Sequence, residues 1–100
     1  MTSMIIKPST KAGKDYMAIF TKANGRTKTT HFGDANLPHY TSGASGASKE
    51  QRTRYRARHK KDLQTNDPTR AGYLSYYILW GQSTSLRENI KSYKKRFRFK

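Results

Sequence analysis

The apolar residues of this sequence are concentrated in one segment, residues 67–80, and their spacing predicts a helix there. The aliphatic residues recur three and four positions apart, so they share one helix face: Ala71, Leu74 and Ile78. Asp67 followed by Pro68 is typical of a helix start, because the carboxylate accepts from free backbone N–H groups and proline costs nothing at the first helical position. Since the rest of the chain is polar, we expect this helix to form the centre of the core and to end before Gly81.

Large aromatic side chains surround that helix face and are candidates for contacts with a partner: Tyr73, Tyr76, Tyr77 and Trp80. Each combines a wide apolar surface with one polar atom, so these rings suit stacking on nucleic-acid bases or filling a pocket of another protein. The alternative interpretation is that they pack inside this small domain, which is the commoner outcome at helical spacing.

Alternating apolar and polar residues predict a β-hairpin near the N-terminus. Its strands, residues 15–21 and 26–32, flank Asn24 and Gly25, a dipeptide that accepts the positive φ angles of a two-residue turn. The register of such a turn pairs Ile19 with Thr30 and Met17 with Phe32. The predicted apolar face therefore consists of Met17, Ile19 and Phe32, and the more mixed face of Tyr16, Phe20, Thr29 and His31.

Two further segments flank the predicted elements. Residues 3–7 favour a short strand, which lies in an N-terminal extension, residues 1–14, that forms either an extra strand or an arm. Residues 42–48 are a Ser-Gly-Ala run typical of a flexible linker. This run is not a phosphate-binding loop, because no Gly-Lys-Ser/Thr motif follows it.

Two basic segments predict helices that begin with a capping box, in which two residues three positions apart bond reciprocally through side chain and backbone. Ser48 with Gln51 begins a helix over about residues 49–63, and Ser85 with Glu88 begins a final helix. The apolar stripe of the final helix is formed by Leu86, Ile90, Tyr93 and Phe97.

Together these elements predict an α+β fold, with an N-terminal antiparallel β-hairpin or three-stranded sheet followed by three α-helices. A single small domain is expected over residues 15–100. The helices that begin at Asp67 and Ser85 are expected to pack as an antiparallel pair over the apolar face of the hairpin.

The charge of the chain restricts its partners. Its 21 Lys and Arg against 6 Asp and Glu give a formal net charge of +15, and only 33% of the residues are hydrophobic. Such a surface repels itself unless nucleic acid, an anionic membrane surface or an acidic protein neutralises it. Insertion into a membrane is not expected, because the sequence contains no signal peptide or long apolar run. The absence of cysteine excludes disulfides and thiolate metal sites.

Most of this charge lies in the predicted helical half. Residues 49–100 contain 15 basic and four acidic residues, which gives this half of the chain a formal net charge of +11. Forked guanidinium groups suit phosphate or carboxylate, although a solvated basic face is the alternative. The candidate polyanion- or partner-binding residues are Arg52, Arg54, Arg56, Arg58, Lys60, Lys61, Lys94, Lys95, Arg96 and Arg98. No base-reading motif is present, so nucleic-acid binding is expected to follow backbone charge, with duplex DNA as the expected form.

Candidate catalytic residues are few. His31, Asp34, Asn36 and His39 follow the hairpin, but their spacing is too tight for a histidine-asparagine-histidine nuclease site. His31 is instead predicted to lie opposite Ala18. The carboxylates are scattered singly, without a pair for acid–base catalysis. We therefore do not expect the chain to be an enzyme, or to bind a metal, a cofactor or a small-molecule substrate.

An ordered set of short motifs in this sequence is similar to that of a known protein family. It comprises Thr30-His31-Phe32-Gly33, Tyr55-Arg56-Ala57-Arg58-His59-Lys60, Ala71-Gly72-Tyr73-Leu74-Ser75 with Ile78-Leu79-Trp80, and Ser85-Leu86 followed by Ile90, Tyr93 and Arg96-Phe97. In this order the motifs, spanning roughly residues 15–97, resemble a family of small, basic, uncharacterised proteins encoded by large DNA viruses of algae and protists. The chain departs from that family's pattern in residues 1–14 and in the Ser-Gly-Ala run after Tyr40-Thr41.

The resemblance implies a viral origin, and it provides no catalytic residues because that family has no established activity. The first functional hypothesis is a non-enzymatic minor capsid or cementing protein that bridges larger capsid proteins. Such a protein would be found in the virion, and in the host cytoplasm or nucleus during assembly. The second hypothesis is a sequence-independent DNA-binding protein for genome packaging or condensation.

Overall fold

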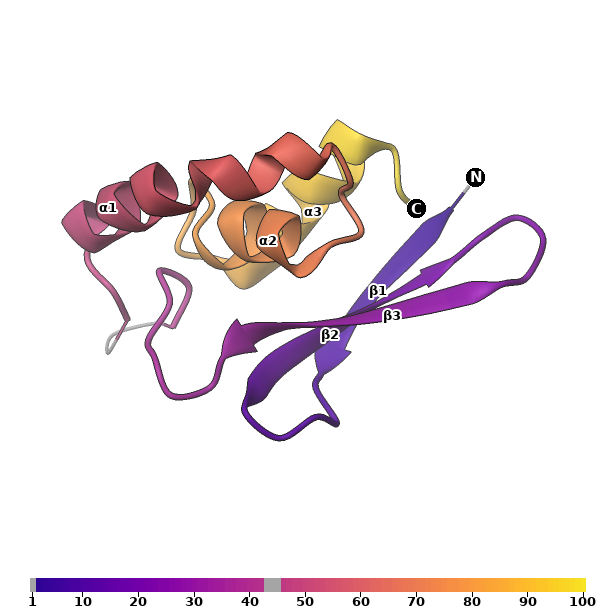
Figure 1. The fold of residues 1–100 in the computed structure, drawn as a ribbon, viewed down its shortest axis with the longest axis horizontal. Helices are drawn as coiled ribbons and strands as arrows, with labels where there is room; N and C mark the ends of the chain where they lie inside the picture. The colour runs from indigo at the N-terminus through magenta and orange to yellow at the C-terminus, as the bar shows by residue number, and fades with distance from the viewer. Residues whose placement is uncertain (1, 43–45) are drawn as a thin grey trace.

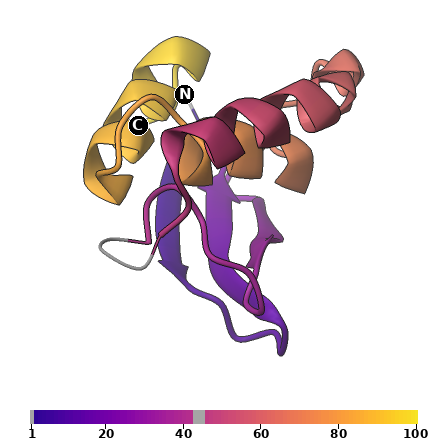
Figure 2. The same cartoon turned by 90° about the vertical axis from the view of Figure 1, so that its left-hand side faces the viewer.

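The computed structural model describes residues 2–42 and 46–100, and it has the expected α+β arrangement (Figure 1). Met1 and the centre of the predicted linker, residues 43–45, lie outside the described residues. The elements are strands β1 (Ser3–Pro8), β2 (Lys14–Thr21) and β3 (Thr27–Asp34), then α1 (Lys49–His59), the 3₁₀-helix η2 (Lys60–Thr65), α2 (Ala71–Leu74), the π-helix η3 (Ser75–Leu79) and α3 (Leu86–Phe97). The helices all lie on one face of the sheet (Figure 2).

The sheet is antiparallel with the order β1-β2-β3. The N-terminal segment is therefore a strand of the sheet rather than an arm, paired with β2 from Ser3 opposite Thr21 to Pro8 opposite Tyr16. The outer edge of β1 is also occupied, because Met4 N donates to the carbonyl of Lys100 and Lys100 N donates to that of Thr2 (2.8 and 3.0 Å). The two ends of the chain consequently lie side by side (Figure 1).

The hairpin between β2 and β3 differs from the prediction by one residue. Lys22 N donates to the carbonyl of Arg26 at 2.8 Å, which encloses a three-residue loop in which Gly25 has a φ of +84°. Asn-Gly fits this loop as well as the two-residue turn, because both need a left-handed residue at the glycine. The predicted two-residue turn is therefore wrong, and Ile19 lies opposite Thr29 rather than Thr30.

This shift changes which residues of β2 share a face with Phe32, because successive side chains of a strand point to opposite sides. The helices cover Ala18, Phe20 and Phe32, whose side chains are 0–1% exposed. The predicted face of Met17, Ile19 and Phe32 is wrong: Met17 and Ile19 lie half-buried on the other face, and Tyr16, not Met17, lies opposite Phe32. His31 lies opposite Met17, not opposite Ala18 as predicted.

The segment 67–80 forms the centre of the core as predicted, but its helix begins later. Asp67 Oδ1 accepts from the backbone N–H and the hydroxyl of Thr69 (2.9 and 2.6 Å), so this carboxylate closes a local turn instead of capping a helix. Thr69 is held against β3, since its carbonyl accepts from the hydroxyl of Thr30 at 2.7 Å. The α-helical turn of α2 starts at Ala71 and continues as η3 to Leu79.

The two basic helices start where the capping residues predict. The Ser48–Gln51 box is complete. Ser85 accepts from the N–H of Glu88, but the predicted reciprocal bond is replaced, because Ser85 N donates to Ser83 Oγ at 2.9 Å. The predicted stripe of α3 faces the core: Tyr93 is buried, and Leu86, Ile90 and Phe97 pack against the buried cluster.

Candidate functional site

A groove of about 290 Å³ lies between α1 and the C-terminal half of α3. Three cations line it, Arg56 from α1 and Lys95 and Arg96 from α3, and we call it the basic groove. The other lining residues are Tyr77, Gly81, Gln82, Asn89, Ser92 and Tyr93. Because none of these residues carries a carboxylate, the three positive charges have no counter-charge within the groove.

Arg56 is held at the floor of the basic groove by η3. Its Nη1 donates to the carbonyls of Tyr76 and Trp80 (3.1 and 2.8 Å), and its guanidinium lies 4.0 Å from the centre of the Tyr76 ring. Partial burial lowers the pKa of Arg56 from its ordinary value, and the positive charge of Arg52 adds to this effect. Arg96 approaches from the other wall, with its guanidinium 5.0 Å from the centre of the Tyr77 ring.

Arg52 has a structural position. Its Nε donates to the carbonyl of Gly81, and its guanidinium lies over the Tyr40 ring at 5.6 Å. Arg52 and Arg56 together satisfy carbonyls at the C-terminal end of η3, which is where a helix leaves such acceptors without partners. Of the predicted polyanion-binding arginines on α1, these two face the protein.

The remaining predicted cations are distributed over the surface. Arg54 and Arg58 line a different cavity, and the other cations outside the basic groove are Lys60, Lys61, Lys94 and Arg98. Among the described residues, carboxylates form ion pairs with Lys28 and Arg70 and lie within hydrogen-bond distance of His39 and His59. None of the ten predicted binding cations therefore has a carboxylate partner in the described part of the chain.

The four predicted aromatic contact residues belong mainly to the core. Tyr73, Tyr76 and Trp80 are only 7–8% exposed, and the hydroxyl of Tyr73 donates to the carbonyl of Leu63 at 2.7 Å. Tyr77 is half-buried and reaches the basic groove. Packing inside the domain is therefore the interpretation that fits these rings.

Asn89 was missed by the sequence analysis. Its side chain is 4% exposed and joins α3 to the end of η3, with Nδ2 donating to the carbonyls of Ile78 and Ser83 (2.9 and 2.7 Å). The signal was present, because Asn89 interrupts the apolar stripe of α3 three residues after Leu86. A polar residue on a core-facing stripe indicates a buried hydrogen-bonding role.

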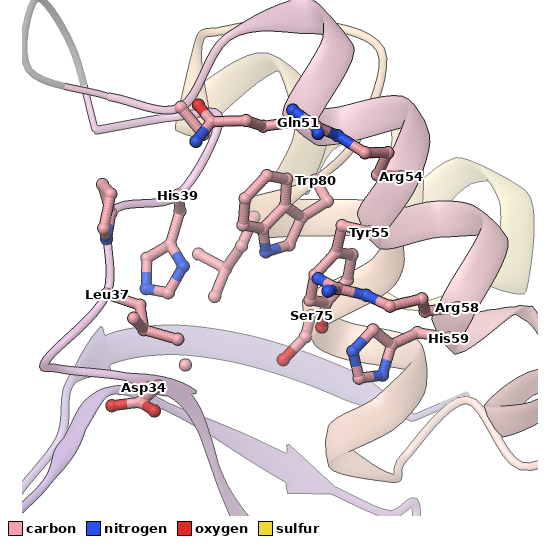
Figure 3. A pocket seen from close by; sticks show the side chains of 14 residues that line it. Asp34, Leu37, His39, Gln51, Arg54, Tyr55, Arg58, His59, Ser75 and Trp80 are labelled. Atoms are coloured by element: carbon pink, nitrogen blue, oxygen red, sulfur yellow. The ribbon is translucent and has the colours of Figure 1, made fainter.

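A second cavity, of about 440 Å³, lies between α1, η3 and the loop after β3 (Figure 3). We call it the aromatic pocket. Its apolar wall consists of Leu37, Pro38, Ala47, Tyr55, Leu79 and Trp80, and its polar wall of Asp34, His39, Gln51, Arg54, Arg58, His59 and Ser75, with Gly33 completing the lining. The ring of Tyr55 is stacked between His59 and Trp80, at centroid distances of 4.2 and 4.4 Å.

One histidine of this pocket has an unusual environment. His39 is 5% exposed, and its Nε2 lies 2.8 Å from the carboxylate of Asp15, so Nε2 carries a hydrogen that Asp15 accepts. Its Nδ1 is buried and has no hydrogen-bond partner among the described residues. An unsatisfied buried polar atom of this kind costs about 1–3 kcal/mol.

The residues considered for a nuclease site are held by local contacts. His31 Nδ1 lies 2.7 Å from the hydroxyl of Ser9, and Asp34 accepts from the backbone N–H of Asn36 at 2.9 Å. In residues 2–42 and 46–100 there is no group of three or more His, Cys, Asp or Glu side chains placed to hold a metal ion. No helix in this part of the chain has the length and apolar character needed to cross a membrane.

Comparison with known proteins identifies a family to which this chain is similar. No curated protein and no solved structure matches the chain. A family model described as a family of unknown function (DUF5754) matches residues 4–59, which extend from β1 to the end of α1 and include 11 of the 14 residues that line the aromatic pocket. Because this match covers more than half of the 100 residues, the chain belongs to the DUF5754 family.

Proposed function

We propose that this protein binds nucleic acid through its phosphate backbone, at the basic groove. The observation that carries the proposal is the convergence of Arg56, Lys95 and Arg96 from two helices on a groove whose lining, among the described residues, contains no carboxylate. Like charges brought together at this density repel one another, and a bound polyanion relieves the repulsion. Packing of the two helices alone does not require three cations along one groove.

The chemistry of the groove favours phosphate. The guanidinium of Arg96 is able to donate two parallel hydrogen bonds to phosphate oxygens, and Lys95 adds a compact positive charge. Ser92 and Gln82 line the same groove and supply neutral donors. Groups of this kind position a backbone and carry no information on base sequence, so the binding is expected to be independent of sequence.

The proposal is tested by reversing charge inside and outside the groove. Lys95→Glu/Arg96→Glu leaves the structural bonds of Arg56 intact, and Lys60→Glu/Lys61→Glu is a matched control on η2, since each pair lowers the net charge from +15 to +11. Binding to labelled duplex DNA is measured by fluorescence anisotropy over a range of NaCl, with circular dichroism as a check of folding. If about three phosphates are contacted in the groove, log K of the wild type falls with log salt at a slope of about −3 or steeper.

The groove variant is expected to bind much more weakly than the control variant and to have a shallower salt slope. If both variants lose the same amount of affinity, DNA binding depends on net charge alone and the groove has no special role. Competition by an acidic polymer without nucleotides, at the same charge concentration, gives a second check, because phosphate recognition requires that DNA compete better.

A second candidate is the minor capsid or cementing protein expected from the viral resemblance, bridging larger capsid proteins. The uncovered face of the sheet favours it: Ile5 is 51% exposed and lies beside Ile19, which in turn is half-buried. Exposed apolar surface on a small basic protein suits a contact with another protein. Mass spectrometry of purified virus particles that does not detect the protein excludes this role.

A further inference from the structure

The aromatic pocket is separate from the basic groove. Arg54 and Arg58 follow Arg52 and Arg56 by two positions, which is about 200° around a helix, so the two pairs face different sides of α1. Figure 3 shows the side chains of Arg54 and Arg58 extending from α1 toward the pocket. We infer that this pocket receives one unpaired nucleotide of a nucleic-acid strand, with the base against Trp80 and the phosphate at Arg54 and Arg58. The inference rests on the proposed nucleic-acid function and specifies the form of strand that this side of the protein binds.

The size and lining of the pocket suit a flat, partly apolar group. Its volume of about 440 Å³ lies within the range of roughly 300–1,000 Å³ that is usual for ligand sites. Leu79 and Trp80 form an apolar floor, and Leu37 stands at the mouth with 59% of its surface exposed. A base that enters the pocket would bury apolar surface of Leu37 that is exposed to solvent in the free protein.

The charges of the pocket are asymmetric. Arg54 and Arg58 are four residues apart on one face of α1, are exposed, and have no hydrogen-bond or carboxylate partner in the described part of the chain. The single carboxylate that lines the pocket, Asp34, is on the opposite side at the end of β3, where it accepts from Asn36 N. A ligand with an anionic end is therefore oriented with that end toward α1.

The polar atoms inside the pocket complement the edge of a base. The indole N–H of Trp80 is turned into the pocket (Figure 3) and has no acceptor among the described residues. The Nδ1 atom of His39, which has no hydrogen-bond partner among the described residues, lies on the side of the ring that faces Trp80. A nucleobase edge carries both donors and acceptors, whereas an acyl chain would leave these polar atoms unsatisfied.

Trp80 provides the probe for the test, because it is the only tryptophan of the sequence and lines the pocket. Its fluorescence is followed while the protein is titrated with single-stranded oligodeoxyadenylate, with an abasic oligomer of the same length, and with duplex DNA. The oligodeoxyadenylate is expected to change the emission of Trp80 in a saturable way. The abasic oligomer and the duplex are expected to bind, as measured by anisotropy, without that change.

A matched pair of variants assigns the signal to the pocket. Leu37 and Ile5 are the two exposed large hydrophobic residues of the described chain, so neither is needed for the core. Leu37→Glu places a negative charge at the pocket mouth. We expect it to raise the oligodeoxyadenylate concentration at half of the fluorescence change roughly tenfold or more. Ile5→Glu makes the same substitution on β1, which contributes no residue to the pocket lining, and is expected to leave the change intact.

The outcomes separate the two proposals. An unchanged Trp80 response to oligodeoxyadenylate in Leu37→Glu, or an identical response to the abasic oligomer, overturns the pocket inference even if DNA binding through the groove is intact. A different outcome supports the pocket and rejects the groove. In that case the wild-type protein does not bind duplex DNA, adenosine monophosphate still changes the emission of Trp80, and Leu37→Glu abolishes this change.

Discussion

At the scale of single residues, Asn89 fixes the end of η3 to α3 beside the basic groove. Its Oδ1 accepts from Ser83 N at 3.1 Å while its Nδ2 donates to two carbonyls, so the amide is satisfied at both ends. The contact also explains Gly81, because a Cβ there would lie 2.8 Å from Cγ of Asn89 and 2.3 Å from the carbonyl oxygen of Tyr77. Asn89 and Gly81 therefore form one tightly packed junction between η3 and α3.

Replacement of Asn89 by aspartate tests this junction. Asn89→Asp exchanges the two N–H donors for an oxygen, so a buried carboxylate then faces the carbonyls of Ile78 and Ser83. We expect the free energy of unfolding to fall by about 3 kcal/mol, measured by urea denaturation at pH 7. Asn24→Asp is the control, because Asn24 is in an exposed turn and its Oδ1, which accepts from Arg26 N, is retained. Similar losses in the two variants would contradict the role of the buried amide.

At the scale of elements, local signals predicted the starts of α1 and α3 well, whereas the predicted end of the first helix near Leu63 is wrong, because α1 ends at His59 and the chain continues as the 3₁₀-helix η2. The N-terminal caps of α1 and α3 and the stripe of α3 depend on residues within one or two turns, and these interactions are nearly independent of the rest of the fold. The hairpin register could not be predicted in this way, because Asn24-Gly25 fits two loop lengths that differ by one residue. That one residue changed which side chains of β2 are buried together with Phe32.

The start of α2 and the candidate sites depend on contacts between distant residues. Asp67 and Pro68 were correct local signals for a helix start, but Thr69 is held by Thr30 of β3, 39 positions away in sequence, and the helix begins only after it. The basic groove likewise combines α1 with η3 and α3, and the aromatic pocket combines α1 with η3 and the loop after β3. The sequence therefore identified the cations that could bind a polyanion, but it could not predict which of them face outward.

The attachment of α1 illustrates this point, since no residue of α1 is buried. Arg56→Ala removes two hydrogen bonds to carbonyls at the end of η3 and the stacking on Tyr76. We expect a loss of about 2 kcal/mol in the free energy of unfolding and a red shift of Trp80 emission as α1 loosens. Arg54→Ala removes the same charge two residues earlier, where no hydrogen bond is lost, and should leave both quantities unchanged. The role assigned to Arg56 is wrong if Arg54→Ala is equally destabilising.

At the scale of the whole molecule, the net charge of +15 is confined to a chain with a radius of gyration of 13.1 Å. Charges at such distances repel one another across much of the protein, and only a few carboxylates offset them. The same charge therefore has two opposite consequences: it destabilises the free protein and favours a complex with a polyanion.

These consequences predict opposite responses to salt. Raising NaCl from 50 to 500 mM shortens the screening length from about 14 to about 4 Å, so repulsion within the free protein weakens. We expect the urea midpoint to rise over this range while the affinity for DNA falls, and chloride is used because sulfate or phosphate could bind the cations directly. Lys60→Glu/Lys61→Glu, with its net charge of +11, should show a smaller rise. If instead the midpoint falls with salt, attraction between specific ion pairs outweighs repulsion, and relief of repulsion cannot be what favours nucleic-acid binding.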